Sequence, residues 1–128
     1  MKPTVLVVED DLASRELLQV WLEGEGYAVQ CTSDVHGSRA AICAAKPDLI
    51  LLDIGLGGED GLELAAWLRR QPQAATIPVI AVTAHAMISE RERIFASGCN
   101  AFLAKPVDFD ELRGFLSDWL LRPSRETY

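Results

Sequence analysis

Acidic, hydroxyl and ammonium side chains follow four short apolar runs of the sequence. Glu9, Asp10 and Asp11 follow the run at 5–8, Asp53 follows 49–52, Thr83 follows 78–82, and Lys105 follows 101–104. An acidic residue after any one strand is commonplace, because Asp caps helices and begins turns. The set is more informative, because the carboxyl ends of parallel strands share one edge of a sheet, where such sheets bind ligands.

Carboxylates gathered at one edge raise one another's pKa unless a cation compensates them. Oxygen ligands without neighbouring Cys or His favour Mg²⁺, with several waters retained, and Mn²⁺ could substitute. An Asp beside Mg²⁺, faced by a Lys and a Thr, is equipped to accept a phosphoryl group as an acyl phosphate. In that chemistry Asp53 is the nucleophile, while the metal and Lys105 offset charge during transfer.

The elements that must position these residues follow from the apolar pattern. The four runs are too short for helices and rich in branched residues, which predicts strands buried on both faces. A weaker alternating run at 28–31 suits an edge strand. Segments of helical length lie between them, at 12–23, 34–45, 61–70, 87–97 and from 108 onward. Alternating strands and helices predict a single α/β domain, a doubly wound three-layer sandwich with a five-stranded parallel sheet.

Composition narrows the class of protein further. The 128 residues carry a net charge of -7 and are 49% hydrophobic, as in an acidic globular domain. That charge opposes direct nucleic-acid binding, which depends on Lys and Arg. With no apolar run long enough to span a bilayer and no signal-peptide pattern, we expect a cytoplasmic protein without membrane insertion. Arg91 and Arg93 alternate with acidic residues, typical of a solvated helix face.

Four segments resemble the motifs of bacterial response-regulator receiver domains, the CheY-like family. They are Val7-Val-Glu-Asp-Asp11, Leu51-Leu-Asp-Ile-Gly-Leu-Gly-Gly-Glu-Asp-Gly61, Val82-Thr-Ala-His-Ala-Met87 and Lys105-Pro106. The match runs in order and at family spacing over residues 4–121, in a style similar to stand-alone phosphorelay regulators and hybrid-kinase receivers. It implies a flavodoxin-like (βα)5 fold with strand order 2-1-3-4-5. Residues 1–121 then form the receiver domain, and 122–128 a polar tail or linker stub.

The resemblance also implies roles around the acceptor. Asp53 matches the phospho-acceptor and Asp10 a direct Mg²⁺ ligand. Glu9 matches the partner acid, which acts mainly through water, and the backbone carbonyl of Gly55 another metal ligand. Lys105 matches the lysine that pairs with the phosphoryl group.

A second group of implied roles concerns the conformational switch. Thr83 is similar to the hydroxyl that binds a phosphoryl oxygen, and Phe102 lies where the family has its switch aromatic, although a core role explains Phe102 equally well. Pro106 is expected to follow a cis peptide bond. Gly55 and His85 occupy places that tune acyl-phosphate lifetime in the family, and His85 is also explained as a residue at a helix start.

The sequence departs from the family in the loop after the acceptor. Leu56-Gly57 stands where a Met-Pro is usual, and Gly58 follows it. Glycine adopts many backbone conformations, so we expect this loop to be more mobile than is usual in the family.

The leading hypothesis is a signalling switch, not an enzyme with a separate substrate, although it supports its own phosphorylation and dephosphorylation. Its donor is a sensor histidine kinase or a histidine phosphotransfer protein, and its target binds the face of the fourth helix, fifth strand and fifth helix. A Mg²⁺-dependent phosphohydrolase would need a second Asp where Gly55 stands. The remaining alternative is a receiver-like interaction module that works without phosphorylation.

Overall fold

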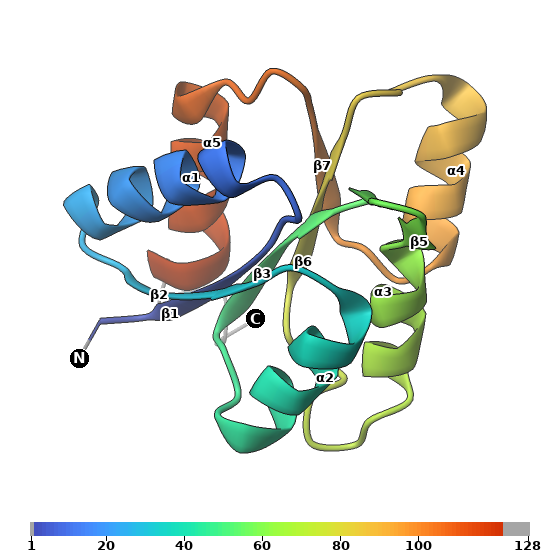
Figure 1. Cartoon of the computed structure of the whole chain (residues 1–128), viewed down its shortest axis with the longest axis horizontal. Coiled ribbons are helices and arrows are strands. Elements are labelled where there is room, and N and C mark those ends of the chain that lie inside the picture. Colours follow the sequence, from blue (N-terminus) through green and yellow to red (C-terminus); the bar gives the residue numbers. More distant parts are fainter. Residues whose placement is uncertain (1, 122–128) are drawn as a thin grey trace.

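The computed structural model of the chain describes residues 2–121, and a five-stranded parallel sheet lies at its centre (Figure 1). The tail or linker stub predicted at 122–128 lies outside the described residues. The strands are β1 (Thr4–Val8), β2 (Ala28–Thr32), β3 (Leu49–Asp53), β6 (Val79–Thr83) and β7 (Ala101–Ala104). Their order is β2-β1-β3-β6-β7. Because β6 and β7 are the fourth and fifth predicted strands, the predicted order 2-1-3-4-5 is confirmed.

Five helices connect and follow the strands: α1 (Leu12–Gly24), α2 (Val35–Ala44), α3 (Leu62–Arg69), α4 (Ile88–Ala96) and α5 (Phe109–Leu116), which continues as the π-helical turn η1 (Ser117–Leu121). The first four predicted helices agree with these bounds to within one residue. Asp11, Asp34 and Asp108 fix three of the helix starts, because each side chain accepts a hydrogen bond from a first-turn backbone N–H. None of the helices within residues 2–121 is both long and apolar enough to cross a membrane.

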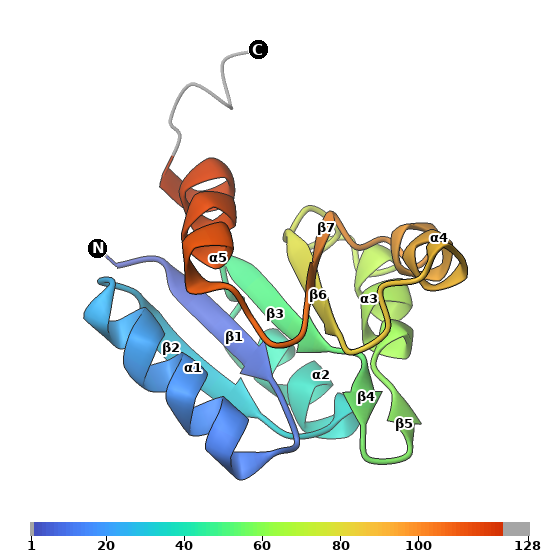
Figure 2. The same ribbon diagram turned by 90° about the horizontal axis from the view of Figure 1, so that it is seen from above.

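The helices cover both faces of the sheet, so the predicted three-layer sandwich is confirmed. Figure 2 shows α1 and α5 on one face and α2, α3 and α4 on the other. Alternate strand residues point to opposite faces. Val7 and Leu51 pack toward α1 and α5, whereas Val8 and Leu52 pack toward the other three helices. All four side chains are fully buried, so the strand ends that carry the polar residues are held by core packing on both sides.

A small antiparallel hairpin follows β3 and was not predicted. It pairs β4 (Gly55–Leu56) with β5 (Glu59–Asp60). Gly57 and Gly58 make its turn with φ angles of 50° and 101°, a region that favours glycine. The Glu59 Oε1 accepts a hydrogen bond from the first backbone N–H of α2 at 3.1 Å. The glycines expected to form a mobile loop therefore turn a hairpin that is anchored to a neighbouring helix.

Gly61, directly after the hairpin, has no room for a side chain. A Cβ there would lie 2.5 Å from the backbone oxygen of Asp53 and 3.1 Å from the Cα of Ile54. We expect Gly61→Ala to lower the free energy of unfolding by about 3 kcal/mol, because only backbone could move aside. The matched control Gly114→Ala lies in open space on α5 and should raise it by about 1 kcal/mol. Urea unfolding of both variants tests this, and equal effects would contradict the packing argument.

Candidate functional site

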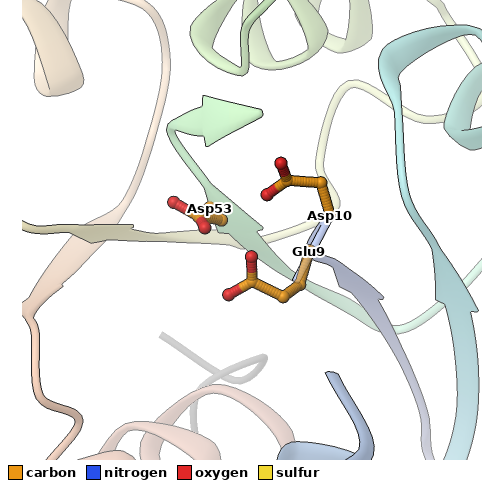
Figure 3. A group of neighbouring side chains, drawn as sticks. All are labelled: Glu9, Asp10 and Asp53. Carbon is orange, nitrogen blue, oxygen red and sulfur yellow. The ribbon is translucent and has the colours of Figure 1, made fainter. Parts of the chain in front are cut away.

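The predicted site residues gather at the carboxyl edge of the sheet. They lie near the switch point between β1 and β3, where the chain changes the direction in which it adds strands to the sheet. Glu9 and Asp10 follow β1, Asp53 ends β3, and Lys105 follows β7. One carboxylate oxygen from each of Glu9, Asp10 and Asp53 lies within 4.8 Å of the other two. Figure 3 shows the three carboxyl groups arranged around a common space. The structure therefore brings together the acidic residues that the sequence placed at separate strand ends.

Lys105 and two backbone amides hold the carboxylates in place. The Lys105 Nζ lies 2.8 Å from the Asp53 Oδ2 and 3.7 Å from the Glu9 Oε1. The Gly55 N–H donates to the Asp53 Oδ1 at 3.1 Å, and the Asp11 N–H donates to the Glu9 Oε2 at 3.2 Å. Burial lowers the pKa of Lys105, but its hydrogen bond to Asp53 and the surrounding carboxylates outweigh this and raise it. Lys105 thus remains a cation at the centre of the site.

Burial and the clustered carboxylates raise the pKa of Glu9. Its side chain is buried, and this burial, together with hydrogen bonding to Asp53 and the charge of that carboxylate, raises the pKa of Glu9 to about 7. The Asp11 N–H and the Lys105 ammonium lower the pKa of Glu9 but do not cancel these effects. One lysine is therefore insufficient to compensate the cluster, and a further cation would relieve it.

This shift predicts how stability depends on pH when divalent metal is chelated. The folded pKa of Glu9 is about 7 and the ordinary value is 4.5, so the folded protein holds a proton between these limits that the unfolded chain has lost. Ionising Glu9 therefore lowers stability as pH rises from about 4.5 to 7, by up to about 3 kcal/mol.

The Glu9→Gln variant lacks this titration. With a chelator present, we expect its free energy of unfolding relative to wild type to increase between pH 5 and pH 8. Urea unfolding at the two pH values measures the change, with the exposed Glu16→Gln as control. A constant difference between Glu9→Gln and wild type would contradict a raised pKa.

The donor set fits Mg²⁺. It consists of carboxylate oxygens, the hard ligands that this ion prefers. At Mg–O distances of about 2.1 Å, two opposite ligands lie about 4.2 Å apart. The carboxylate oxygens of the cluster lie within 4.8 Å of one another, close to this span. Gly57 lies close to this space, since a Cβ there would come within 2.8 Å of the Asp10 Oδ2. The hairpin turn therefore leaves the Asp10 carboxylate room that a side chain would fill.

Thr83 lies beside the site, but its hydroxyl is bonded elsewhere. The neighbouring residue Val82 pairs with Asp53 across β6 and β3. The Thr83 carbonyl accepts a hydrogen bond from the Lys105 backbone N–H at 2.8 Å. The Thr83 Oγ1 accepts from the His85 N–H at 2.9 Å and donates to the His85 carbonyl at 3.2 Å. The imidazole of His85 belongs to an exposed residue. Thr83 is thus held by the loop that leads to α4.

Phe102 and Pro106 complete the predicted set. Phe102 lies in β7, half-buried, and packs against the core on the α2–α4 face. The Lys105–Pro106 peptide bond is cis. A cavity of about 510 Å³ opens beside the carboxylates. Its lining includes Glu9, Asp53 and Lys105, together with mainly apolar residues of the strands, of α1 and of the segment leading into α5.

A doubly wound sheet with acidic residues and a lysine at its carboxyl edge is the arrangement expected of a receiver domain. The sequence matches the response regulator receiver domain over residues 5–117. The chain belongs to this family, and it is a receiver domain of a two-component response regulator. Receiver domains act as signalling switches.

Three relatives illustrate the similarity. The polar-differentiation response regulator DivK of Brucella anthropi is 35% identical over 122 residues, covering 92% of this chain and 99% of that protein. The DNA-binding dual master transcriptional regulator RpaA of Synechocystis is 36% identical over 123 residues, covering 96% of this chain but 51% of RpaA. The receiver domain of sensor histidine kinase PA1611 from Pseudomonas aeruginosa has a TM-score of 0.86 at 30% identity, covering 95% and 100% of the two chains. That structure has a magnesium ion coordinated in its active-site cleft.

Proposed function

We propose that this protein is a phospho-acceptor switch in which Asp53 receives a phosphoryl group from a phosphohistidine, with Mg²⁺ as cofactor. One observation carries the proposal. The buried Asp53 carboxylate is held 2.8 Å from the Lys105 ammonium, and oxygens of Glu9 and Asp10 lie within 4.8 Å. This places a nucleophile, a cation and a set of metal ligands in one site.

The transfer is a substitution at phosphorus. A carboxylate oxygen of Asp53 forms the new P–O bond, the P–N bond to the donor breaks, and its electron pair stays on the imidazole nitrogen. Lys105 moves its hydrogen bond from Asp53 to a phosphoryl oxygen, and Thr83 supplies a hydroxyl from the adjacent strand. Asp10, Glu9 through water, Asp53 and the Gly55 carbonyl would hold Mg²⁺. When bound, the ion offsets charge on the transferring group.

The donor in this proposal is a sensor histidine kinase or a histidine phosphotransfer protein. Exposed apolar side chains on α1 support a protein donor, because Leu12 and Leu17 are each 58% exposed. Leu17 also lines the cavity that opens at Asp53. A helix that packs against these residues could bring its phosphohistidine to the acceptor.

The output in this proposal is a change in protein binding at the face formed by α4, β7 and α5. Met87, Ile88 and Phe95 support this, since all three are large apolar residues with at least half of their surface exposed. The net charge of -7 favours protein partners over nucleic acid, and we place the switch in the cytoplasm. Gly55 and His85 would set how long the acyl phosphate lasts.

Incubation with a small acyl-phosphate donor tests the proposal directly. With Mg²⁺ present, we expect the intact protein to gain the mass of one phosphoryl group. Excess chelator should prevent the gain, because the carboxylates alone repel the donor's charge. Mass spectrometry of the intact protein measures both. A protein that gains no phosphate with Mg²⁺ would be a receiver-like interaction module, and the proposal would be wrong.

A further inference from the structure

We infer that Arg91 is a positioning residue that holds Phe102 in its resting orientation and links it to the loop after Thr83. The inference rests on the proposed function. The Arg91 Cζ lies 5.2 Å from the centroid of the Phe102 ring, within the range of a cation–π interaction. The Arg91 Nε donates a hydrogen bond to the Ala86 carbonyl at 2.9 Å. Arg91 is exposed, in agreement with the solvated helix face that the sequence predicts, and these two contacts add to that interpretation.

The contacts form a continuous chain from the Thr83 hydroxyl to the Phe102 ring. The Thr83 Oγ1 is bonded to the N–H and the carbonyl of His85, and the next carbonyl along the chain, that of Ala86, binds Arg91. A hydroxyl has a single proton to donate. If Thr83 donates to a phosphoryl oxygen, it must release the His85 carbonyl. The loop then loses one of its anchors, and the carbonyl that holds Arg91 becomes free to move.

The surroundings of Phe102 leave room for a second ring position. A cavity of about 450 Å³ is lined by Ala86, Arg91, Phe95 and Phe102, among other residues of this face. Phe95 meets the Phe102 ring edge-on, with 6.1 Å between the centroids. The Phe102 ring is therefore held by a few specific contacts and is not closely packed on every side. A side chain that switches between two positions needs such free space.

Arg93 provides a matched control on the same helix. It is an exposed arginine like Arg91, but its guanidinium bonds Asp60 at 2.7 Å and Glu90 at 2.9 Å. Neither of these ion pairs involves Phe102 or the loop at 83–86. A substitution at Arg93 thus removes the same charge from α4 and leaves the Phe102 contact in place.

Removing Arg91 should raise the fraction of protein in the phosphorylation-competent state. The observed rate of phosphorylation is proportional to that fraction when the competent state is a minor one. We expect Arg91→Gln to be phosphorylated about fivefold faster than wild type by acetyl phosphate with Mg²⁺, equivalent to about 1 kcal/mol. Arg93→Gln should react at the wild-type rate.

A double-mutant cycle with Phe102→Leu identifies the ring as the partner. In the Phe102→Leu background, Arg91→Gln should change the initial rate by less than about twofold, because no ring remains for the guanidinium to contact. The inference is wrong if Arg91→Gln is no faster than wild type, if Arg93→Gln accelerates equally, or if the full acceleration persists without the ring.

The unphosphorylated protein gives a readout that needs no donor. The guanidinium over the ring should shift the Phe102 ring-proton resonances, so these should move in Arg91→Gln and stay in place in Arg93→Gln. Unmoved resonances would overturn the contact itself. A wild-type protein that gains no phosphate would overturn the proposed function and this inference together, whereas a phosphorylated wild type with an unaccelerated Arg91→Gln overturns the inference alone.

Discussion

An Asp53→Asn protein should gain no phosphate from a small acyl-phosphate donor under conditions in which wild type gains one phosphoryl group. The substitution replaces a carboxylate with an amide of nearly the same shape, whose oxygen is a poor nucleophile. Gly55 N–H and Lys105 donate to different oxygens of Asp53, so the single oxygen of an Asn keeps one of these two hydrogen bonds. The substitution also removes a negative charge beside Glu9, so we expect the folded state to be retained without metal.

The control for this prediction is Asp60→Asn. Asp60 lies in the hairpin that follows Asp53 and β3, but it is exposed and bonds Arg93 and the start of α3. This variant should gain phosphate as wild type does, and the phosphate should be released by hydroxylamine, as expected of an acyl phosphate. A gain that persists in Asp53→Asn would place the nucleophile elsewhere in the cluster, with Asp10 the next candidate.

Local sequence pattern was enough to predict that strands and helices alternate five times along this chain. Four of the five strands of the sheet are continuous apolar runs followed or ended by polar residues, and three helices begin at an Asp that caps them. The order of the strands came from the family resemblance. Once the strands are parallel and adjacent, Glu9, Asp10, Asp53 and Lys105 must share one edge, so most of the site followed from the positions of the strand ends.

What the sequence did not predict depends on contacts between distant residues. The hairpin at 55–60 has strands of two residues each, which are too short to show a recognisable alternation of apolar and polar residues. Its turn depends on two glycines with positive φ. Arg91 and Arg93 have the spacing of a solvated helix face. Their partners include Phe102 and Asp60, which α4 meets only after the chain has folded.

Mg²⁺ should stabilise the folded protein markedly, and Asp10→Asn should remove most of that effect. An ion that binds only the folded state stabilises it by about 2.7 kcal/mol at a concentration 100 times its Kd. For a domain of 128 residues this corresponds to a rise in Tm of roughly 10 °C. Thermal unfolding with Mg²⁺, with Mn²⁺ and with chelator measures the effect, and Mn²⁺ should act as Mg²⁺ does.

Asp11→Asn is the control that separates a metal site from general charge screening. It removes one negative charge from the next residue along, and Asn still caps α1 in place of Asp. If the ion is bound by the carboxylates of Asp10 and Asp53, Asp11→Asn keeps the Mg²⁺ effect and Asp10→Asn loses it. Equal losses in both variants would mean that Mg²⁺ only screens an acidic surface. Without metal, Asp10→Asn should be at least as stable as wild type, because the buried Glu9 and Asp53 then face one carboxylate fewer.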